Sequence, residues 1–206
     1  MPARSRFTRP QLQAAALALV DGDGLAALSM RSLAGALGTG PMTLYNYVRN
    51  RDDLDALVVE AVLAEVVRPR TRGDWQADVR AIVEATWRTL RRHPNVVPLV
   101  LTRRTLHDTT LDWAEHLLEA LARSGRSGTD LLVAFRTVSG FVMGFVQAQL
   151  AQPAIGEGDP DIARAQALPP DRYPRLIEIA KAASRLGPDR EFRAGLEIVM
   201  AGLTAS

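Results

Sequence analysis

The segment that most constrains the fold is residues 29–54, because a glycine and a proline inside it fix where one short helix ends and the next begins. Ser29 is suited to cap the first of these helices. The apolar positions of that helix fall on one buried stripe, formed by Leu33, Ala34 and Leu37. Gly38 then stops the helix, since glycine adopts the positive φ that a helix C-terminus often needs, and Pro41 begins the second helix with its φ already set. The segment therefore predicts two helices joined by a tight turn.

The second helix has an inner and an outer side of different chemistry. Leu44 and Val48 lie one turn apart and are predicted to point inward. The outer side suits the major groove of DNA, where asparagine can pair with the adenine edge and the methyl groups of threonine and methionine can contact the thymine methyl group. Pro41 marks the N-terminal end, which a recognition helix usually presents to bases.

The predicted DNA-binding residues follow from this orientation. They are Arg31, Pro41, Met42, Thr43, Tyr45, Asn46, Tyr47 and Arg51. Arg31, Arg49 and Arg51 flank the two helices and are expected near phosphates, which supply affinity and register more than sequence information.

These residues also carry a specific resemblance. The positions concerned are Gly24-Leu25, Leu28-Ser29, Arg31-Ser32-Leu33-Ala34, Leu37-Gly38, Thr43-Leu44-Tyr45 and Tyr47-Val48-Arg49-Asn50-Arg51. Together they resemble the N-terminal domain of the TetR family of transcriptional regulators, and most closely the branch that includes the tetracycline repressor. The other interpretation of this segment is a small helical bundle with tyrosine and arginine on its surface.

Charge is distributed unevenly along the 206 residues. Residues 1–51 contain six arginines and two aspartates, net +4, whereas the whole chain has a formal net charge of +2. A basic lobe on a nearly neutral body is typical of a DNA-binding module. The chain has no cysteine, which excludes a disulfide framework and a thiolate metal site. Residues 1–11 are short, polar and basic and do not read as a signal peptide, so we expect the protein in the cytoplasm.

The remaining periodicity predicts an all-α fold. Thr8 and Gln11 stand at the spacing of a capping box and open a helix that would complete a three-helix DNA-binding domain. The basic arm before it, residues 1–7, is expected to be either a disordered tail or a minor-groove contact. Further helices are predicted at 50–67, 74–92, 96–101, 106–122, 129–151, 175–186 and 191–203, with a linker at 68–73 and a long loop at 152–171.

The predicted domains are a helix-turn-helix DNA-binding domain at residues 1–52 and an effector-binding and dimerisation domain at 68–206. A connecting helix at 51–67 joins them, and the resemblance implies that it transmits the ligand signal.

The helix predicted at 129–151 is apolar on nearly every side. A transmembrane span has to be considered at this length, but Arg136, Gln147 and Gln149 inside it argue against one. A helix of this kind in a soluble protein has to be covered on all sides, which a second copy of the chain does most simply. Gly140 and Gly144 would let a partner backbone come close.

The resemblance implies a homodimer built from this helix and the last one, as a four-helix interface with the same pair in the second subunit. The predicted interface residues are Gly140, Phe141, Gly144, Phe145, Leu196, Val199 and Met200.

Asp112, His116 and Glu119 have ligand-like spacing on the helix predicted at 106–122. They sit on its polar side and no second helix offers partner ligands, so we interpret them as a solvated face. No metal site and no cofactor are therefore predicted.

The resemblance further implies a small-molecule pocket in the body. The residues that the order of elements places there are Ile82, Thr86, Trp87, Leu90, Leu99, Thr102, Arg103, Trp113, Phe135, Val138 and Gln147. Thr102-Arg103 matches a pair near the drug–metal site of the tetracycline repressor, but Leu99 stands where the metal-binding histidine belongs and Ile82 replaces a polar position. A magnesium–tetracycline complex fits poorly, and a more apolar effector fits better.

The sequence thus predicts a ligand-responsive, homodimeric regulator of transcription, most simply a repressor released from a palindromic operator by a small, largely apolar effector. Activation instead of repression stays open. The alternative from another class is an all-α enzyme or a carrier of apolar ligands. The three histidines of the chain are scattered, and no nucleophile–base pair or carboxylate pair stands out in the sequence. Both observations argue against an enzyme.

Overall fold

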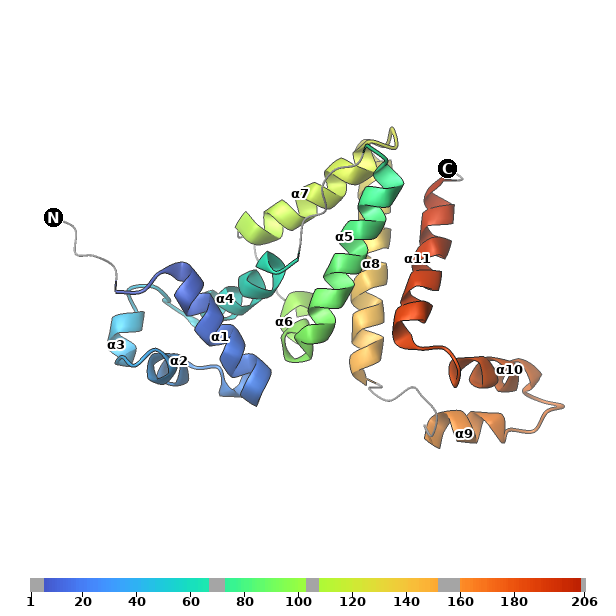
Figure 1. The fold of residues 1–206 in the computed structure, drawn as a ribbon, viewed down its shortest axis with the longest axis horizontal. Helices are drawn as coiled ribbons and strands as arrows, with labels where there is room; N and C mark the ends of the chain where they lie inside the picture. The colour runs from blue at the N-terminus through green and yellow to red at the C-terminus, as the bar shows by residue number, and fades with distance from the viewer. Residues whose placement is uncertain (1–5, 67–72, 103–107, 152–159, 205–206) are drawn as a thin grey trace. The chain divides into compact units, whose positions relative to one another are not determined.

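The computed structural model describes residues 6–66, 73–102, 108–151 and 160–204, and every regular element within these ranges is a helix (Figure 1). The predicted all-α fold is confirmed. The elements are α1 (Arg9–Asp23), η1 (Leu25–Ala27), α2 (Met30–Ala36), α3 (Pro41–Leu44), α4 (Arg51–Ala64), α5 (Trp75–Arg92), η2 (Pro94–Val96), α6 (Val97–Thr102), α7 (Asp108–Ala122), α8 (Gly128–Ala151), α9 (Pro160–Gln166), α10 (Pro174–Ala183) and α11 (Pro188–Thr204). They form two compact units, Met1–Val142 and Met143–Ser206, and α8 runs from the first into the second.

The ends of the first helices are set by short-range hydrogen bonds. At α1 the backbone N–H of Thr8 donates to the Gln11 side chain at 2.8 Å, and the Thr8 hydroxyl accepts from the Gln11 N–H at 3.4 Å, so the predicted capping box is confirmed. Ser29 caps α2 by accepting from the Ser32 N–H at 3.1 Å. After α2, Gly38 has a φ of +61° and the Thr39 N–H donates to the Ala34 carbonyl at 2.9 Å, which closes the helix as predicted.

Helix α4 packs along α1, and a buried carboxylate joins the two (Figure 1). Glu60 of α4 accepts from Arg9 Nε at 2.8 Å, from Arg9 Nη2 at 2.6 Å and from Gln13 Nε2 at 2.7 Å. The side chain of Glu60 is only 4% exposed, so these three donors replace the water that the carboxylate gives up. Asn50 caps α4 by accepting from the Asp53 N–H at 2.8 Å. The helix ends at Ala64, three residues before the predicted end, and residues 67–72 lie outside the described ranges.

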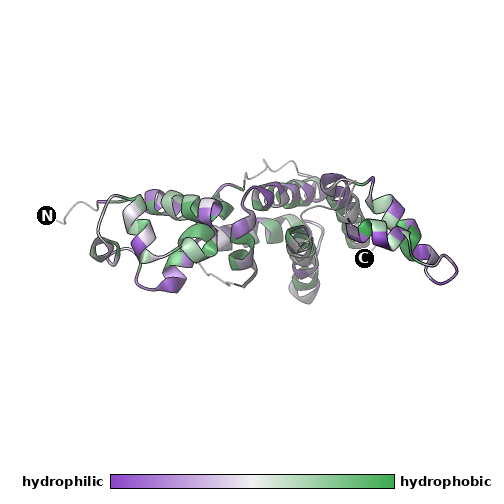
Figure 2. Ribbon diagram, turned by 90° about the horizontal axis from the view of Figure 1, so that it is seen from below, coloured by the Kyte–Doolittle hydropathy of each residue, from purple (hydrophilic) through white to green (hydrophobic). Residues whose placement is uncertain are grey.

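The body begins with α5, which buries one side. The residues of that side are Val79, Ile82, Val83, Thr86, Trp87 and Leu90, while Trp75 at the start of the helix is half-buried. Asp78 is buried as well and forms an ion pair with Arg123 just after α7. Helix α7 buries Leu117 and Leu121, whereas Leu111 near its start is 45% exposed. The helices toward the N-terminus carry both polar and apolar residues, as in amphipathic elements around a core (Figure 2).

Helix α8 is buried along one stripe, formed by Ala134, Val138, Val142 and Val146. Its other side is exposed at Val133, Gly140 and Gly144. The stretch Gly128–Leu150 is long and apolar enough to cross a membrane by length and composition alone, a criterion that core helices of soluble proteins also meet.

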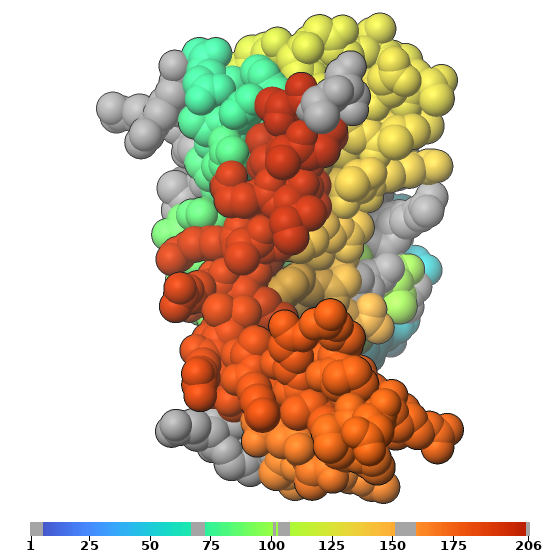
Figure 3. All heavy atoms as spheres, turned by 90° about the vertical axis from the view of Figure 1, so that its right-hand side faces the viewer, coloured from blue at the N-terminus to red at the C-terminus, as the bar shows by residue number. Residues whose placement is uncertain are grey.

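The second unit corrects two predictions. The loop predicted at 152–171 contains helix α9, which packs beside α10, with Gln166 Nε2 donating to the Ala180 carbonyl at 3.3 Å (Figure 3). Pro160 and Asp161 looked like loop residues, but both are also favoured in the first turn of a helix. Helix α11 begins at Pro188, before the predicted start at 191.

Two of the predicted dimer-interface residues lie in the core of the single chain, since Leu196 and Met200 are each 1% exposed there. Phe145 meets Phe192 edge-on, with ring centroids 5.5 Å apart. The outward side of α11 carries Ile198, which is 76% exposed.

Candidate nucleic-acid interface and effector-binding residues

The predicted recognition element is shorter than the sequence suggested. Regular helix α3 covers only Pro41–Leu44, and the chain then continues as a turn in which the N–H groups of Tyr47 and Val48 donate to the Leu44 carbonyl at 2.8 and 2.9 Å. The turn is needed because Asn50 must be extended, with a φ of −150°, to cap α4. The residues from Pro41 to Val48 still lie on one continuous curved segment.

The inner and outer sides of this segment are as predicted. Leu44 and Val48 are fully buried, while Met42 is 79% and Tyr45 50% exposed. Asn46 is exposed and Thr43 half-buried. Two apolar anchors therefore hold the segment against the head and leave polar and methyl-bearing side chains outside.

Tyr47 has a role that the sequence did not reveal. It is half-buried, and its hydroxyl accepts from the backbone N–H of Phe7 at 3.2 Å. The two rings meet edge-on with centroids 6.2 Å apart, and the Arg6 guanidinium lies 5.5 Å from the centroid of the Phe7 ring. Tyr47 thus fixes the point at which the basic N-terminal arm joins the recognition segment.

Arg51, predicted near a phosphate, also contacts groups of the head itself. Its Nη1 donates to the Leu28 carbonyl at 2.5 Å, and its Nε lies 2.8 Å from Oδ1 of Asp55, which is 2% exposed. The Asp55 carboxylate, one turn further along α4, and the Leu28 carbonyl together hold the guanidinium in place. Arg31 and Arg49 are exposed.

Four of the predicted effector residues meet in the body. The Trp113 indole N–H donates to the Thr86 hydroxyl at 3.0 Å, and that hydroxyl donates to the Ile82 carbonyl at 2.9 Å. The Trp113 and Phe135 rings have centroids 6.4 Å apart. Helices α5, α7 and α8 therefore converge on a mainly apolar cluster with one polar centre. The neighbouring candidates Trp87, Leu90, Leu99 and Val138 are buried.

Other predicted effector residues are not part of this cluster. Thr102 is exposed, and its hydroxyl donates to the Pro98 carbonyl at 2.7 Å. Gln147 is exposed and belongs to the second unit. Arg103 lies outside the described residues. A hollow of about 400 Å³ opens between α1 and α4, and none of the predicted effector residues lines it.

The polar side of α7 carries His116, which contacts its own helix. The Nδ1 of His116 lies 2.8 Å from the backbone carbonyl of Asp112 in the same helix. Within the described part of the chain, no group of three histidine, cysteine or acidic side chains is placed to hold a metal ion.

Residues 69–206 match the family described as "Tetracyclin repressor-like, C-terminal domain". The HTH-type transcriptional repressor DrrR1 of Streptomyces coeruleorubidus is 31% identical over 210 residues, which cover 96% of this chain and 77% of that protein. The tetracycline repressor protein class D of Escherichia coli is 30% identical over 202 residues, covering 96% and 89% of the two chains.

Solved structures agree with these relatives. Apo ActR from Streptomyces coelicolor superposes with a TM-score of 0.85 at 31% identity, over 98% of this chain and 97% of that one. ActR in complex with actinorhodin has the same TM-score at 30% identity, over 97% and 96% of the two chains. Mycobacterium smegmatis BioQ with its double-stranded DNA operator shares the fold, with a TM-score of 0.70 at 24% identity over 98% and 100%. The chain belongs to the TetR family of DNA-binding, ligand-responsive transcriptional regulators.

Proposed function

We propose that the chain is a homodimeric repressor that binds a palindromic operator through α3 and the turn after it, and leaves the operator when a small, largely apolar molecule binds in the body. The observation that carries this proposal is the outer side of α3 and the turn after it in a member of this family. Met42 and Asn46 are exposed there, while Leu44 and Val48 are buried.

The DNA contacts divide into base-reading and phosphate-binding residues. Pro41, Met42 and Thr43 form the N-terminal end of the segment, and Tyr45 and Asn46 continue the same outer side. Arg31 and Arg49, both exposed, take the phosphate role, and Tyr47 adds a hydroxyl at the base of the arm. The Arg51 side chain is half exposed and contacts Leu28 and Asp55 of the head, so we assign it to stability before affinity.

The effector is proposed to bind near Thr86, Trp113 and Phe135. Relatives support a ligand in this fold, since ActR has been solved with (S)-DNPA and with actinorhodin. In this chain the cluster offers aromatic surface and one hydroxyl–indole pair, which favours an apolar ring system that carries one hydrogen-bonding group.

The dimer is proposed to form through the exposed sides of α8 and α11. Gly140 and Gly144 have no atom within 4 Å of an added Cβ in the single chain, so a partner helix can come close there. Ile198 supplies the exposed apolar contact on α11. Leu196 and Met200 support this surface from the core.

We infer a regulator in preference to the rival enzyme or carrier, because the relatives are transcriptional repressors and regulators. We also infer that it acts in the cytoplasm, where the chromosome of a bacterial cell is found.

Operator selection followed by substitution tests the proposal. Duplexes are selected from a random library with the wild-type protein, and affinities are measured at a fixed salt concentration. Replacing Asn46 or Thr43 with alanine is expected to cost about 1–3 kcal/mol and to relax specificity at one base pair, because a base contact is lost. Arg49→Ala should weaken binding to all sequences alike and lower the salt slope, because a phosphate contact is lost.

Arg175→Ala, in the exposed part of α10, is the matched control and should leave operator affinity unchanged. Operator binding at wild-type strength and specificity by all three head variants would remove α3 from the proposal.

A further inference from the structure

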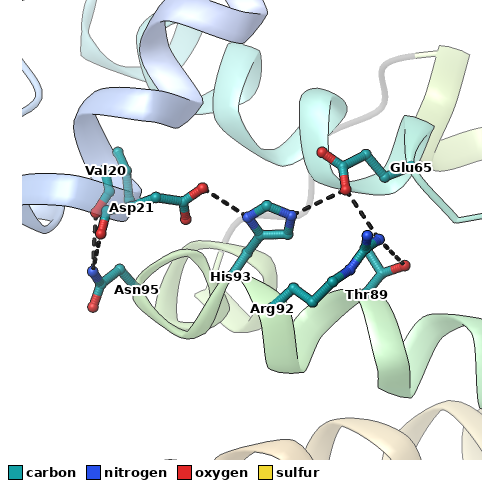
Figure 4. A network of polar contacts seen from close by, with 7 residues as sticks. All are labelled: Val20, Asp21, Glu65, Thr89, Arg92, His93 and Asn95. Carbon is teal, nitrogen blue, oxygen red and sulfur yellow. Dashed lines mark hydrogen bonds and ion pairs between the residues drawn. The ribbon is translucent and has the colours of Figure 1, made fainter.

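The corner where α5 ends contacts the DNA-binding head through several side chains, among them that of His93. His93 caps the C-terminus of α5, and its side chain is 12% exposed. Its Nδ1 lies 2.8 Å from Oδ2 of Asp21 in α1, and its Nε2 lies 3.1 Å from Oε2 of Glu65 at the end of α4 (Figure 4). A single imidazole thus lies between carboxylates from two head helices.

The chemistry of this arrangement depends on a proton. A carboxylate only accepts hydrogen bonds, and a neutral imidazole has one N–H and one lone pair. Both contacts are hydrogen bonds only when the ring carries two N–H groups and a positive charge. In the neutral ring, one nitrogen lone pair faces a carboxylate oxygen, which is repulsive.

Two further contacts hold the same corner without a proton. Asn95 of η2 donates from Nδ2 to the backbone carbonyls of Val20 at 3.0 Å and of Asp21 at 3.3 Å. Both carbonyls belong to the last turns of α1, and that of Val20 also accepts from the Gly24 N–H at 2.9 Å. Arg92 donates from Nη2 to Oε2 of Glu65 at 3.1 Å (Figure 4).

We propose that His93 is a positioning residue that fastens the end of α5 to α1 and α4, and that this fastening binds one proton. The proposal rests on the proposed function, because it names a control of the same head. The state that keeps both contacts takes up the proton, and a state in which the head parts from α5 releases it. Lower pH therefore favours the fastened state and higher pH the parted one.

Three charged groups surround the ring. Asp21 faces it from α1, Glu65 faces it from the end of α4, and Arg92 is the charged neighbour on α5. Asn95 from η2 is neutral.

Thermal unfolding of the full chain at pH 6 and pH 8 tests the fastening directly, with no DNA or effector required. His93→Asn should lower the Tm by about 2–4 °C at pH 6 and by less than half of that at pH 8, because only the charged ring holds both carboxylates. His116→Asn is the matched control, since His116 contacts the Asp112 carbonyl of its own helix. In the Asp21→Asn/Glu65→Gln background, the pH dependence of the His93 effect should disappear.

The regulatory consequence is tested with an operator duplex selected by the wild-type protein. The ratio of operator Kd values at pH 6 and pH 8 should differ at least about threefold between wild type and His93→Asn, and His116→Asn should match wild type. An equal loss of Tm at both pH values would overturn the fastening as a proton-binding contact. A pH-dependent Tm effect with identical Kd ratios would overturn its link to the operator. Failure of the wild-type protein to select any duplex would instead count against the proposed function and leave the Tm result standing.

Discussion

Glu60 shows how a single buried charge fixes two helices of the head. Its hydrogen bonds with Arg9 raise the pKa of that guanidinium above its ordinary value, against the lowering effect of burial. The Arg9 side chain is half exposed, whereas Glu60 is nearly buried. If the arginine is removed, the main energetic penalty is therefore a buried carboxylate that has lost its charged hydrogen-bond donor. Gln13 remains as one donor.

Arg9→Ala is therefore expected to lower the free energy of unfolding by about 2–3 kcal/mol, because a buried carboxylate loses its charged partner. Urea unfolding followed by circular dichroism measures the change. The control is Arg175→Ala, whose partner Glu178 is 65% exposed, and which should cost less than about 0.5 kcal/mol. Equal losses in the two variants would contradict a structural role for the Arg9–Glu60 pair.

The contacts of Arg51 and His93 could not be predicted from residue type and local sequence. Arg51 was predicted at a phosphate from its position beside the two helices, yet it contacts a carbonyl 23 residues earlier in the chain. His93 could be recognised only as a helix end, and its partner Asp21 is 72 residues away. Residue type and spacing do not report partners at such distances.

At the scale of elements, α8 is a helix with one side already covered by its own chain. The sequence predicted that all its sides need cover, and the structure leaves the side with Gly140 and Gly144 exposed. A glycine inside a helix lowers helix stability by about 1 kcal/mol relative to a good helix former. Glycine at these two positions is therefore explained better by the close approach of a partner helix than by the stability of α8.

Gly144→Leu should convert the dimer into a monomer, because the larger side chain occupies the space of the partner helix. The single chain should not lose stability, since an added Cβ meets nothing within 4 Å and leucine is the better helix former. Analytical ultracentrifugation gives the oligomeric state, and circular dichroism gives the helix content.

Gly22→Leu in α1 is the matched control, because its Cβ also meets nothing within 4 Å and it lies in the head. It should remain dimeric. A dimeric Gly144→Leu variant would place the interface elsewhere.

For the whole molecule, two heads in one symmetric dimer must reach two half-sites at once. Half-sites on successive major grooves lie about 34–36 Å apart along one face of the duplex. A dimer of this kind therefore reads the distance between half-sites as well as their bases.

Inserting five base pairs between the half-sites should reduce affinity to that of a single half-site, because half a helical turn moves the second site to the opposite face. Electrophoretic mobility shift with the selected operator measures the loss, and the same five base pairs added outside the operator should have no effect. Unchanged binding to the split operator would mean that one head suffices and that the palindrome is not read by a dimer.

The sequence by itself determined where most helices begin and end, and which side of α3 faces inward. Thr8, Ser29, Gly38 and Asn50 act on groups three to five residues away, so their effects are present in the local sequence. The missed helix α9 fits this explanation, because proline and aspartate are favoured both in loops and at helix starts.

Only the tertiary structure decided which charges are paired and which apolar sides are covered. Arg9 and Glu60 are 51 residues apart, and their pairing depends on how α1 lies along α4. Leu196 and Ile198 are equally apolar in sequence, yet one is in the core and the other is 76% exposed. A helical pattern marks an apolar side, but only packing against other helices determines what that side contacts.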